Sequence, residues 1–379
     1  MGTAMTSADD TLYRLMEKGK GILRLRPNYV RRVYVDGGRL SGSRPGGTFN
    51  PRDSLWRPER WIASGTPAVN PHPIPGEGLS QLADAPLLLV DAFRMAGGRM
   101  LGPKRFLAHG PEFRVLLKVL DGITPIPFHF HPSDAAVRSD PKHFHDARFG
   151  KDEAYYFLKA PRGPCPYTHV GLHPGTTMRE FRRAMACGAD AMLDLSPFFL
   201  QRFEEGFFLP GGVIHRPGTA LALEIQQPCD ASIRLEDRMG DRKLSPEEMH
   251  AGFDSLEQAL RHLDLKASTQ RDIIERNRLV PRPVSRRPLR GGSEDWIFPP
   301  TMCSKFSGKR LRVRSGLVTV EDDCYALLVW KGTGRIGPHR AQSGDEFFVT
   351  HETARTGVAI ECRGEPLELF KCFAAPIQM

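Results

Sequence analysis

A pair of histidines, His129 and His131, is the feature of this sequence best suited to bind a metal ion. They flank one phenylalanine in an apolar run that predicts a strand, and side chains two residues apart on a strand share a face, about 6–7 Å apart. Two imidazoles at that spacing can reach one ion. A carboxylate, Glu153, comes near the start of another predicted strand, and His215 follows a Pro-Gly-Gly turn. We predict that these four side chains converge on one metal site.

Three neutral imidazoles and one carboxylate suit Zn²⁺, Fe²⁺, Mn²⁺, Co²⁺ or Ni²⁺ and leave positions open for substrate or water. The residue types alone leave the choice among these metals open. Four further histidines lie in polar loops flanked by proline and are predicted to be solvated: His143, His145, His169 and His173.

Short apolar runs separated by turn residues predict a mainly β fold. The chain of 379 residues has 37 glycines and 32 prolines, which fall between these runs and form no repeat. Strands are predicted near residues 113–120, 128–131, 153–158, 207–209 and 219–227, and a second group lies between residues 311 and 373. In residues 219–227, small or polar side chains that include Glu224 alternate with leucine and isoleucine, which predicts a half-buried strand.

Three helices are predicted. One opens the chain with Leu12, Leu15 and Met16 on its apolar side, and another spans residues 177–195. A capping box with proline at the first helical position begins at Ser245, and the apolar residues behind it predict one continuous helix to about residue 265. A basic, proline-rich linker follows at residues 282–290, so two β units flanking a helical segment are expected.

Charge and cysteine content restrict the class of protein. The formal net charge is +9, but the basic residues are dispersed and accompany no nucleic-acid-binding motif, so we expect an anionic small molecule as partner and no nucleic acid. The apolar runs are too short to cross a membrane. Seven cysteines without a C-x-x-C pair argue against a disulfide framework and for a reducing, cytoplasmic location.

The combination of H-x-H with P-x-G-x-x-H (residues 210–215) resembles the cupin superfamily, a β-barrel fold that uses these positions as metal ligands. Other segments resemble type I phosphomannose isomerases in particular: FRVLLKVLD (113–121), HPSD (131–134), GKDE (150–153), LEIQQ (223–227) with IR (233–234) and, more faintly, ERWIAS (59–64) and RLSG (39–42). The resemblance covers most of residues 26–264 and thins to a likeness of fold in the C-terminal part.

The resemblance implies a mainly β protein, with a cupin (jelly-roll) β-barrel, a second, smaller cupin-like β unit and a few helices between them. It implies a metal-binding catalytic domain (residues 1–240), a helical segment with the basic linker (241–294) and a metal-free C-terminal β domain (295–379). It also implies an aldose–ketose isomerase that uses one divalent ion, zinc first. The expected reaction interconverts mannose 6-phosphate and fructose 6-phosphate through an enediol.

Two positions depart from the family pattern. The first metal ligand of the family is usually glutamine, whereas this chain has His129, and a serine two residues earlier is replaced by Pro127. The alternatives are therefore a cupin isomerase or epimerase for another sugar, a cupin dioxygenase, and a sugar-binding regulatory cupin without turnover.

An aldose–ketose isomerase needs a base near the sugar carbons and positive charge for the developing enediolate. Glu224 is the candidate base, Arg234 the candidate for charge stabilisation, and Lys151 a candidate to move a proton to oxygen or hold the substrate; the choice of base between Glu224 and Lys151 stays open. Candidates for the substrate phosphate, chosen by charge and position, are Lys118, Arg138, Lys142 and Arg148.

Overall fold

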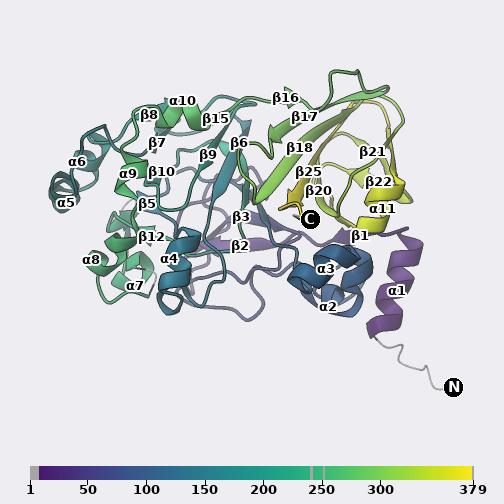
Figure 1. The fold of residues 1–379 in the computed structure, drawn as a ribbon, viewed down its shortest axis with the longest axis horizontal. Coiled ribbons are helices and arrows are strands. Elements are labelled where there is room, and N and C mark those ends of the chain that lie inside the picture. Colours follow the sequence, from purple (N-terminus) through teal and green to yellow (C-terminus); the bar gives the residue numbers. More distant parts are fainter. Residues whose placement is uncertain (1–7, 240–241, 251, 378–379) are drawn as a thin grey trace.

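The computed structural model describes residues 8–239, 242–250 and 252–377, and its sheets stack in four layers that run from left to right in Figure 1. Helices cover the left end, and two facing sheets form a first β unit. A further pair of facing sheets forms a second β unit on the right. The fold is mainly β, as the sequence predicts.

The first unit pairs a five-stranded with a seven-stranded sheet. The five-stranded sheet has the order β12 (Ile233–Arg234), β5 (His129–Phe130), β10 (His215–Arg216), β7 (Tyr167–Val170) and β8 (Phe198–Leu200). The seven-stranded sheet has the order β15 (Arg278–Leu279), β9 (Gly206–Leu209), β6 (Glu153–Lys159), β11 (Leu221–Gln226), β4 (Leu116–Leu120), β3 (Trp56–Ile62) and β2 (Tyr29–Arg32). A two-stranded ribbon, β13 (Arg238–Met239) and β14 (Arg242–Lys243), lies outside both sheets.

The second unit also pairs two sheets. Its larger sheet has the order β1 (Ile22–Leu25), β23 (Glu346–Val349), β20 (Tyr325–Lys331), β25 (Leu367–Ala374), β18 (Phe306–Val313), β17 (Gly292–Phe298) and β16 (Arg282–Pro283). The smaller sheet has the order β19 (Leu317–Thr319), β24 (Val358–Cys362), β21 (Thr333–Ile336) and β22 (His339–Gln342). This larger sheet takes β1 from the start of the chain and β16 from residues 282–283, and the expected domain limits stay a prediction.

Side chains along each strand of the seven-stranded sheet of the first unit point alternately to its two faces, and one face turns toward the five-stranded sheet. In β6, Tyr155 and Phe157 face the five-stranded sheet, whereas Tyr156 and Leu158 face the second unit. In β11, the leucines and Ile225 join the same core as Phe298 and Phe370 of the second unit. The expected half-buried strand is therefore buried on both faces, because the second unit covers what would otherwise be its outer side.

The helices are short. They are α1 (Ala8–Lys18), α2 (Leu89–Met100), α3 (Pro103–His109), α4 (Asp134–Ser139), α5 (Met178–Cys187), α6 (Ala189–Leu193), α7 (Pro246–His250), α8 (Leu256–Ala259), α9 (Leu265–Ser268), α10 (Ile273–Asn277) and α11 (His351–Thr356), with 3₁₀ turns at Lys142–Phe144 and Leu260–His262. The opening helix is confirmed, with Leu12 and Met16 buried. The capping box at Thr177 is formed, but the helix ends at Gly188, whose φ is +106°, and a second one follows.

The prediction of one helix over residues 245–265 is wrong. The capping box at Ser245 forms, with the Glu248 carboxylate accepting from the Ser245 amide, but α7 ends at His250. Gly252 has a φ of +90°, and Ser255 then caps α8 through the Gln258 amide. The second cap starts a new helix, and α8 passes directly into the 3₁₀ turn Leu260–His262, so the apolar residues of this segment belong to several short elements.

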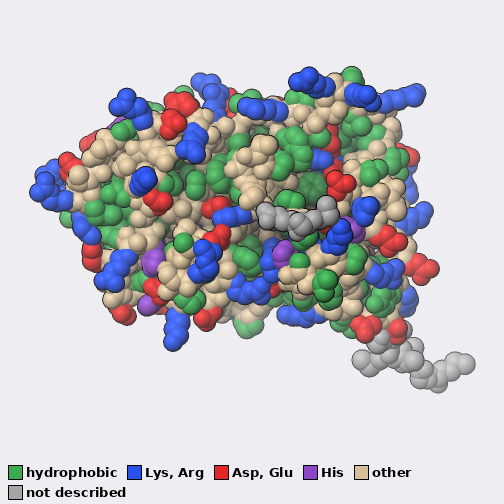
Figure 2. Space-filling model, in the orientation of Figure 1, with side chains coloured by type: hydrophobic (Ala, Val, Ile, Leu, Met, Phe, Trp, Pro, Cys, Tyr) green, Lys and Arg blue, Asp and Glu red, His purple; other side chains and the backbone are tan. Residues whose placement is uncertain are grey.

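The charged side chains are dispersed over the surface, as the sequence predicts. On the face drawn in Figure 2, basic and acidic side chains are interspersed. All seven cysteines are free thiols, as expected from their spacing. Within the described ranges we find no helix with the length and apolar character needed to span a bilayer.

Candidate metal site

Three histidine side chains from adjacent strands of the five-stranded sheet meet in the interior of the first unit. His215 of β10 lies directly opposite His129 of β5, and their ring centroids are 4.0 Å apart. His131 directly follows β5, and its ring centroid lies 4.9 Å from that of His129 and 5.1 Å from that of His215. One ligand nitrogen from each of these buried rings lies within 4.8 Å of the others, so the three can hold one ion.

The predicted carboxylate reaches the same point from the facing sheet. Glu153 begins β6 and is 0% exposed. Its Oε2 lies 3.2 Å from Nε2 of His131, and its Oε1 lies 3.2 Å from Nε2 of His215. The hydroxyl of Tyr155 donates to Oε1 at 2.7 Å, which fixes the orientation of the carboxylate. Glu153 therefore lies beside two of the three clustered rings, and its place in the ligand set stays a prediction.

Backbone carbonyls set the tautomer of each ring. Nδ1 of His129 donates to the carbonyl of Pro127 at 2.7 Å, and Nδ1 of His215 donates to that of Val213 at 3.0 Å. Nδ1 of His131 donates to the carbonyl of Ala231, also at 3.0 Å. With the proton on Nδ1, each Nε2 presents a lone pair to the centre of the cluster, which is the arrangement of a metal-ligating imidazole.

The electrostatic surroundings keep these groups in their ligand forms. Burial, and then the neighbouring His215 and His131, place the pKa of His129 well below its ordinary value. Burial and the Lys151 ammonium lower the pKa of His131 to about 3. Burial opposes ionisation of Glu153, but Lys151 and His131 outweigh it and hold the pKa of that carboxyl well below its usual range. Neutral imidazoles and a charged carboxylate are the states that bind metal.

One buried polar atom supports a metal at this position. Nε2 of His215 has no hydrogen-bond partner among the described residues, and the ring proton lies on Nδ1, bound to the carbonyl of Val213. Such an atom is costly to bury unless something satisfies it. A divalent cation with nitrogen and oxygen ligands is the group that fits, and His129, His131, Glu153 and His215 are the residues that would hold it.

Both candidate bases lie beside the ligands. The Lys151 ammonium is 2.8 Å from Glu153 Oε2, 2.8 Å from His131 Nε2 and 3.6 Å from Glu224 Oε1. Burial lowers the pKa of Lys151, but the carboxylates of Glu153 and Glu224 outweigh it, so the net shift is upward. Glu224 is 1% exposed, its Oε1 has no hydrogen-bond partner among the described residues, and burial raises its pKa to about 8.

The candidate arginine lies on the neighbouring strand. Arg234 of β12 is opposite His129 in the sheet, and its guanidinium donates to the backbone carbonyl of Glu248. In the part of the chain that the structure describes it forms no ion pair with a carboxylate. It lines a cavity of about 90 Å³ together with Arg32 and Asp230. Burial and the nearby Arg32 charge lower its pKa.

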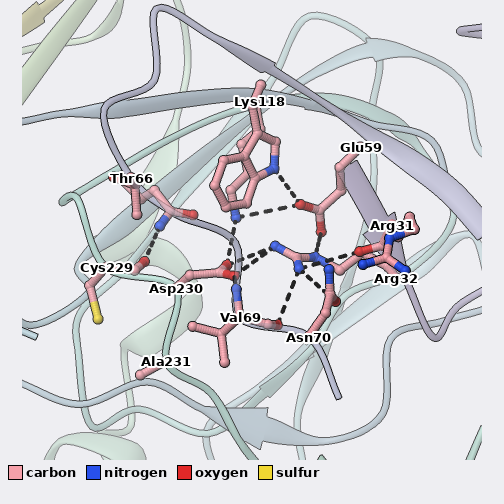
Figure 3. A network of polar contacts seen from close by, with 12 residues as sticks. Arg31, Arg32, Glu59, Thr66, Val69, Asn70, Lys118, Cys229, Asp230 and Ala231 are labelled. Carbon is pink, nitrogen blue, oxygen red and sulfur yellow. Dashed lines mark hydrogen bonds and ion pairs between the residues drawn. The ribbon is translucent and has the colours of Figure 1, made fainter. Parts of the chain in front are cut away.

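A network of buried charges lies between Glu224 and strands β2 and β3. Figure 3 shows the part of it that includes Lys118, Glu59, Arg32 and Asp230. The Lys118 ammonium lies 3.6 Å from both Glu59 and Asp230 and 3.9 Å from Glu224. The Arg32 guanidinium donates to both oxygens of Asp230, at 2.8 and 2.9 Å, and to Glu59 at 3.0 Å. Burial opposes ionisation of Glu59, but Arg32 and Lys118 outweigh it and lower its pKa.

Sequence reasoning missed most of this network and the supporting tyrosine. Tyr155 could have been found, because it lies two residues after Glu153 on the same strand face. Arg32 and Asp230 are 198 positions apart in the chain, and no local pattern marks either as a partner.

The four phosphate candidates lie in different surroundings. Lys118 is buried among carboxylates, as described above. Arg148 is exposed, donates to both oxygens of Glu112, and lines a cavity of about 400 Å³ that also reaches Asp230. Arg138 and Lys142 are exposed on α4 and on the turn after it. The phosphate assignment stays a prediction.

One of the four histidines predicted to be solvated is not. His169 of β7 is only 5% exposed, and its Nδ1 donates to the carbonyl of Ser196 at 3.0 Å. It lies opposite Arg216, next to the ligand strand, but is no member of the histidine cluster. The polar sequence around it forms strand β7, whose inner face is buried.

Replacing Gly150 by alanine is expected to lower the free energy of unfolding by about 1–3 kcal/mol. A Cβ there would lie 2.4 Å from the amide nitrogen of Asp134 and 2.5 Å from the carbonyl carbon of Ser133, and backbone atoms cannot move aside freely. Denaturant unfolding measures the change. The control is Gly98→Ala in α2, where the added Cβ meets no atom within 4 Å and no stability is lost. Equal stability of both variants would contradict the close packing of residues 133–134 on Gly150.

This chain resembles known proteins in its fold but not in its sequence. No protein-family profile and no curated protein matches the sequence. Solved structures do match, over almost the whole chain. The mannose 6-phosphate isomerase from Bacillus subtilis superposes with a TM-score of 0.68 at 18% identity, covering 93% of this chain and 99% of that one.

This chain has the fold of mannose 6-phosphate isomerases. An arginine-to-alanine variant of the phosphomannose isomerase from Salmonella typhimurium gives a TM-score of 0.65 at 13% identity, with 94% of this chain and 100% of that one covered. A mannose 6-phosphate isomerase bound with zinc and yttrium gives 0.64, also at 13% identity and with the same coverage. The expected cupin fold is thereby confirmed, and the shared fold extends through the second β unit.

Proposed function

We propose that this chain is a metal-dependent aldose–ketose isomerase that interconverts mannose 6-phosphate and fructose 6-phosphate. The observation that carries the proposal is the convergence of three imidazoles and Glu153 with Lys151 and Glu224 at one buried point. This point lies in a fold shared, over nearly the full chain, with mannose 6-phosphate isomerases, one of them bound with zinc. Zinc is therefore the first choice of metal.

A divalent ion in this site supplies Lewis-acid polarisation of the sugar oxygens. Glu224 is the group we assign to proton transfer between carbon 1 and carbon 2. Its carboxyl has a pKa raised to about 8 by burial, so it can both take and return a proton near neutral pH. Its Oε1 accepts no hydrogen bond from the described residues and lies 3.6 Å from the ammonium of Lys151 and 3.9 Å from that of Lys118.

Lys151 is less suited to be the base. Its ammonium contacts Glu153 and His131, and the net upward shift of its pKa keeps it protonated. A fixed positive charge beside the ligands suits stabilisation of the enediolate or protonation of a sugar oxygen. Arg234, a cation without a carboxylate partner among the described residues, is assigned to the same task from the opposite sheet.

The sugar phosphate is proposed to approach along residues 228–231, where the two cavities of about 400 and 90 Å³ share Asp230 and Ala231. The carbonyl of Ala231 holds His131, so this segment borders the metal site. Of the four phosphate candidates, Arg148 is the one that lines the larger cavity and is proposed for that role.

The test is turnover of mannose 6-phosphate by protein freed of metal with a chelator and resupplied with zinc, manganese, cobalt or iron. We expect fructose 6-phosphate to form only after metal is restored, and unphosphorylated mannose to be a poor substrate. Stoichiometric metal binding without turnover of mannose 6-phosphate would contradict the proposed reaction.

A further inference from the structure

Lys305 belongs to the second β unit, but its ammonium contacts side chains of the first. It lies in the loop between β17 and β18, and its ammonium is 2.7 Å from Asp134 Oδ2 and 2.9 Å from Asp152 Oδ2. It also donates to Oε1 of Gln227 at 3.1 Å. Three oxygens thus match the three donors of one ammonium.

The other oxygen of each aspartate holds a backbone amide. Asp152 Oδ1 accepts from the amide of Gly211 at 2.8 Å, and Asp134 Oδ1 accepts from the amide of Gly150, also at 2.8 Å. The side-chain amide of Gln227 donates to Asp134 Oδ1 at 2.9 Å. Each carboxylate therefore bridges Lys305 to a glycine of the first unit.

These glycines lie in segments that deliver metal ligands. Gly211 is in the turn that leads to His215, and the next amide in that turn, that of Gly212, donates to the carbonyl of His131 at 2.7 Å. Gly150 precedes Lys151, whose amide donates to the carbonyl of Pro132 at 2.8 Å.

Asp152 itself is adjacent to Glu153. Segments carrying three of the four ligands thus meet around the Lys305 ammonium.

We propose that Lys305 is a positioning residue for the metal site, so that the second β unit helps to assemble the site of the first; this rests on the proposed function. Without its ammonium, Asp134 and Asp152 would face each other as like charges in a partly buried place. Their separation would release the Gly150 and Gly211 amides and loosen the segments that carry His131, Glu153 and His215.

The loop that carries Lys305 is flanked by two buried aromatic side chains. Phe298, at the end of β17, and Phe306, at the start of β18, are 0% exposed. They share a core with Leu223 and Ile225 of β11, which is the strand that carries Glu224. Both ends of the loop are therefore packed against the first unit.

The test measures binding of zinc alone to the full chain, by competition with a chromophoric chelator. We expect K305M to bind zinc about 10–100-fold more weakly, the loss typical when a residue that orients a metal ligand is removed. In the double variant K305M/D152N we expect most of the affinity to return, because asparagine keeps the acceptor for Gly211 and removes the repulsion. K305Q, which keeps a hydrogen-bond donor, replaces K305M in both measurements where the latter does not stay folded.

The matched control is K309M. Lys309 is a neighbouring lysine of the second unit whose ammonium lies 2.6 Å from Glu321 and 3.8 Å from Glu294, both in the same unit. We expect its loss to leave zinc affinity within about threefold of the parent.

Parental affinity in K305M, or a loss in K305M that D152N does not reverse, would overturn the inference. Because zinc is measured without sugar, a parent that binds zinc but turns over no sugar phosphate would overturn the proposed function alone.

Discussion

Replacing His131 by alanine is expected to weaken zinc binding far more than the about 10–100-fold typical of residues that only orient a ligand, and to abolish the proposed isomerase activity. The ring supplies one of four groups that converge on a single point, with Nε2 3.2 Å from Glu153 and Nδ1 held by Ala231. Its loss also leaves Glu153 and Lys151 facing a space without a ligand. Equilibrium competition for zinc and the initial rate of mannose 6-phosphate turnover measure the two effects.

His169→Ala is the matched control for this variant. His169 is another buried histidine of the same sheet, with Nδ1 likewise bound to a backbone carbonyl, but it lies outside the cluster. Its removal is expected to cost stability and to leave zinc affinity close to that of the parent. Parental zinc affinity in the His131 variant, or equal losses in both variants, would contradict the assignment of the cluster.

Glu224→Gln is expected to lower kcat by about 10²–10⁴-fold, the usual contribution of a general acid–base group. Glutamine keeps the size of the side chain but cannot exchange a proton. Zinc affinity is expected to stay close to that of the parent, since Glu224 is none of the four ligands, and KM is expected to change little. Steady-state kinetics with the zinc-loaded protein gives kcat and KM separately.

A suitable control is Glu346→Gln in the second unit. Glu346 is also a buried glutamate, and burial raises its pKa to about 7, but it pairs with Arg60 away from the metal ligands. Its substitution is expected to leave kcat unchanged. A Glu224 variant that keeps more than about a tenth of kcat would transfer the role of base to another group, with Lys151 the next candidate.

The ligands were accessible to sequence reasoning because part of the geometry is local. The side chains of His129 and His131 share a strand face, and the Pro-Gly-Gly turn places His215 at the start of a strand. That Glu153 joins them depends on how two sheets face each other, which no spacing determines; it was predicted from its residue type and its place near the start of a strand. Glu224 was predicted to lie among the small and polar side chains of its strand. Its contact with Lys151 was not predicted, because it joins two different strands.

Features that depend on distant pairings were missed. Arg32 of β2 meets Asp230 in the segment between β11 and β12, and Lys305 reaches Asp134 from the other β unit. No spacing pattern in the sequence indicates which charged residues form ion pairs with each other, so these residues could not be paired in advance. The interruption of the helix after Ser245 could have been predicted, because Gly252 and Ser255 are local signals for the end of one helix and the start of the next. The helical spacing of the apolar residues was given more weight than these two signals.

The most direct test of this account is the metal content of the reconstituted protein, measured by elemental analysis and X-ray absorption at the zinc edge. We expect one zinc per chain, with imidazole nitrogens and a carboxylate oxygen as ligands and no sulfur, since the free cysteines take no part in the cluster. Zinc that does not reach stoichiometry, or zinc bound by sulfur, would contradict the site on which the proposed function and the role of Lys305 depend.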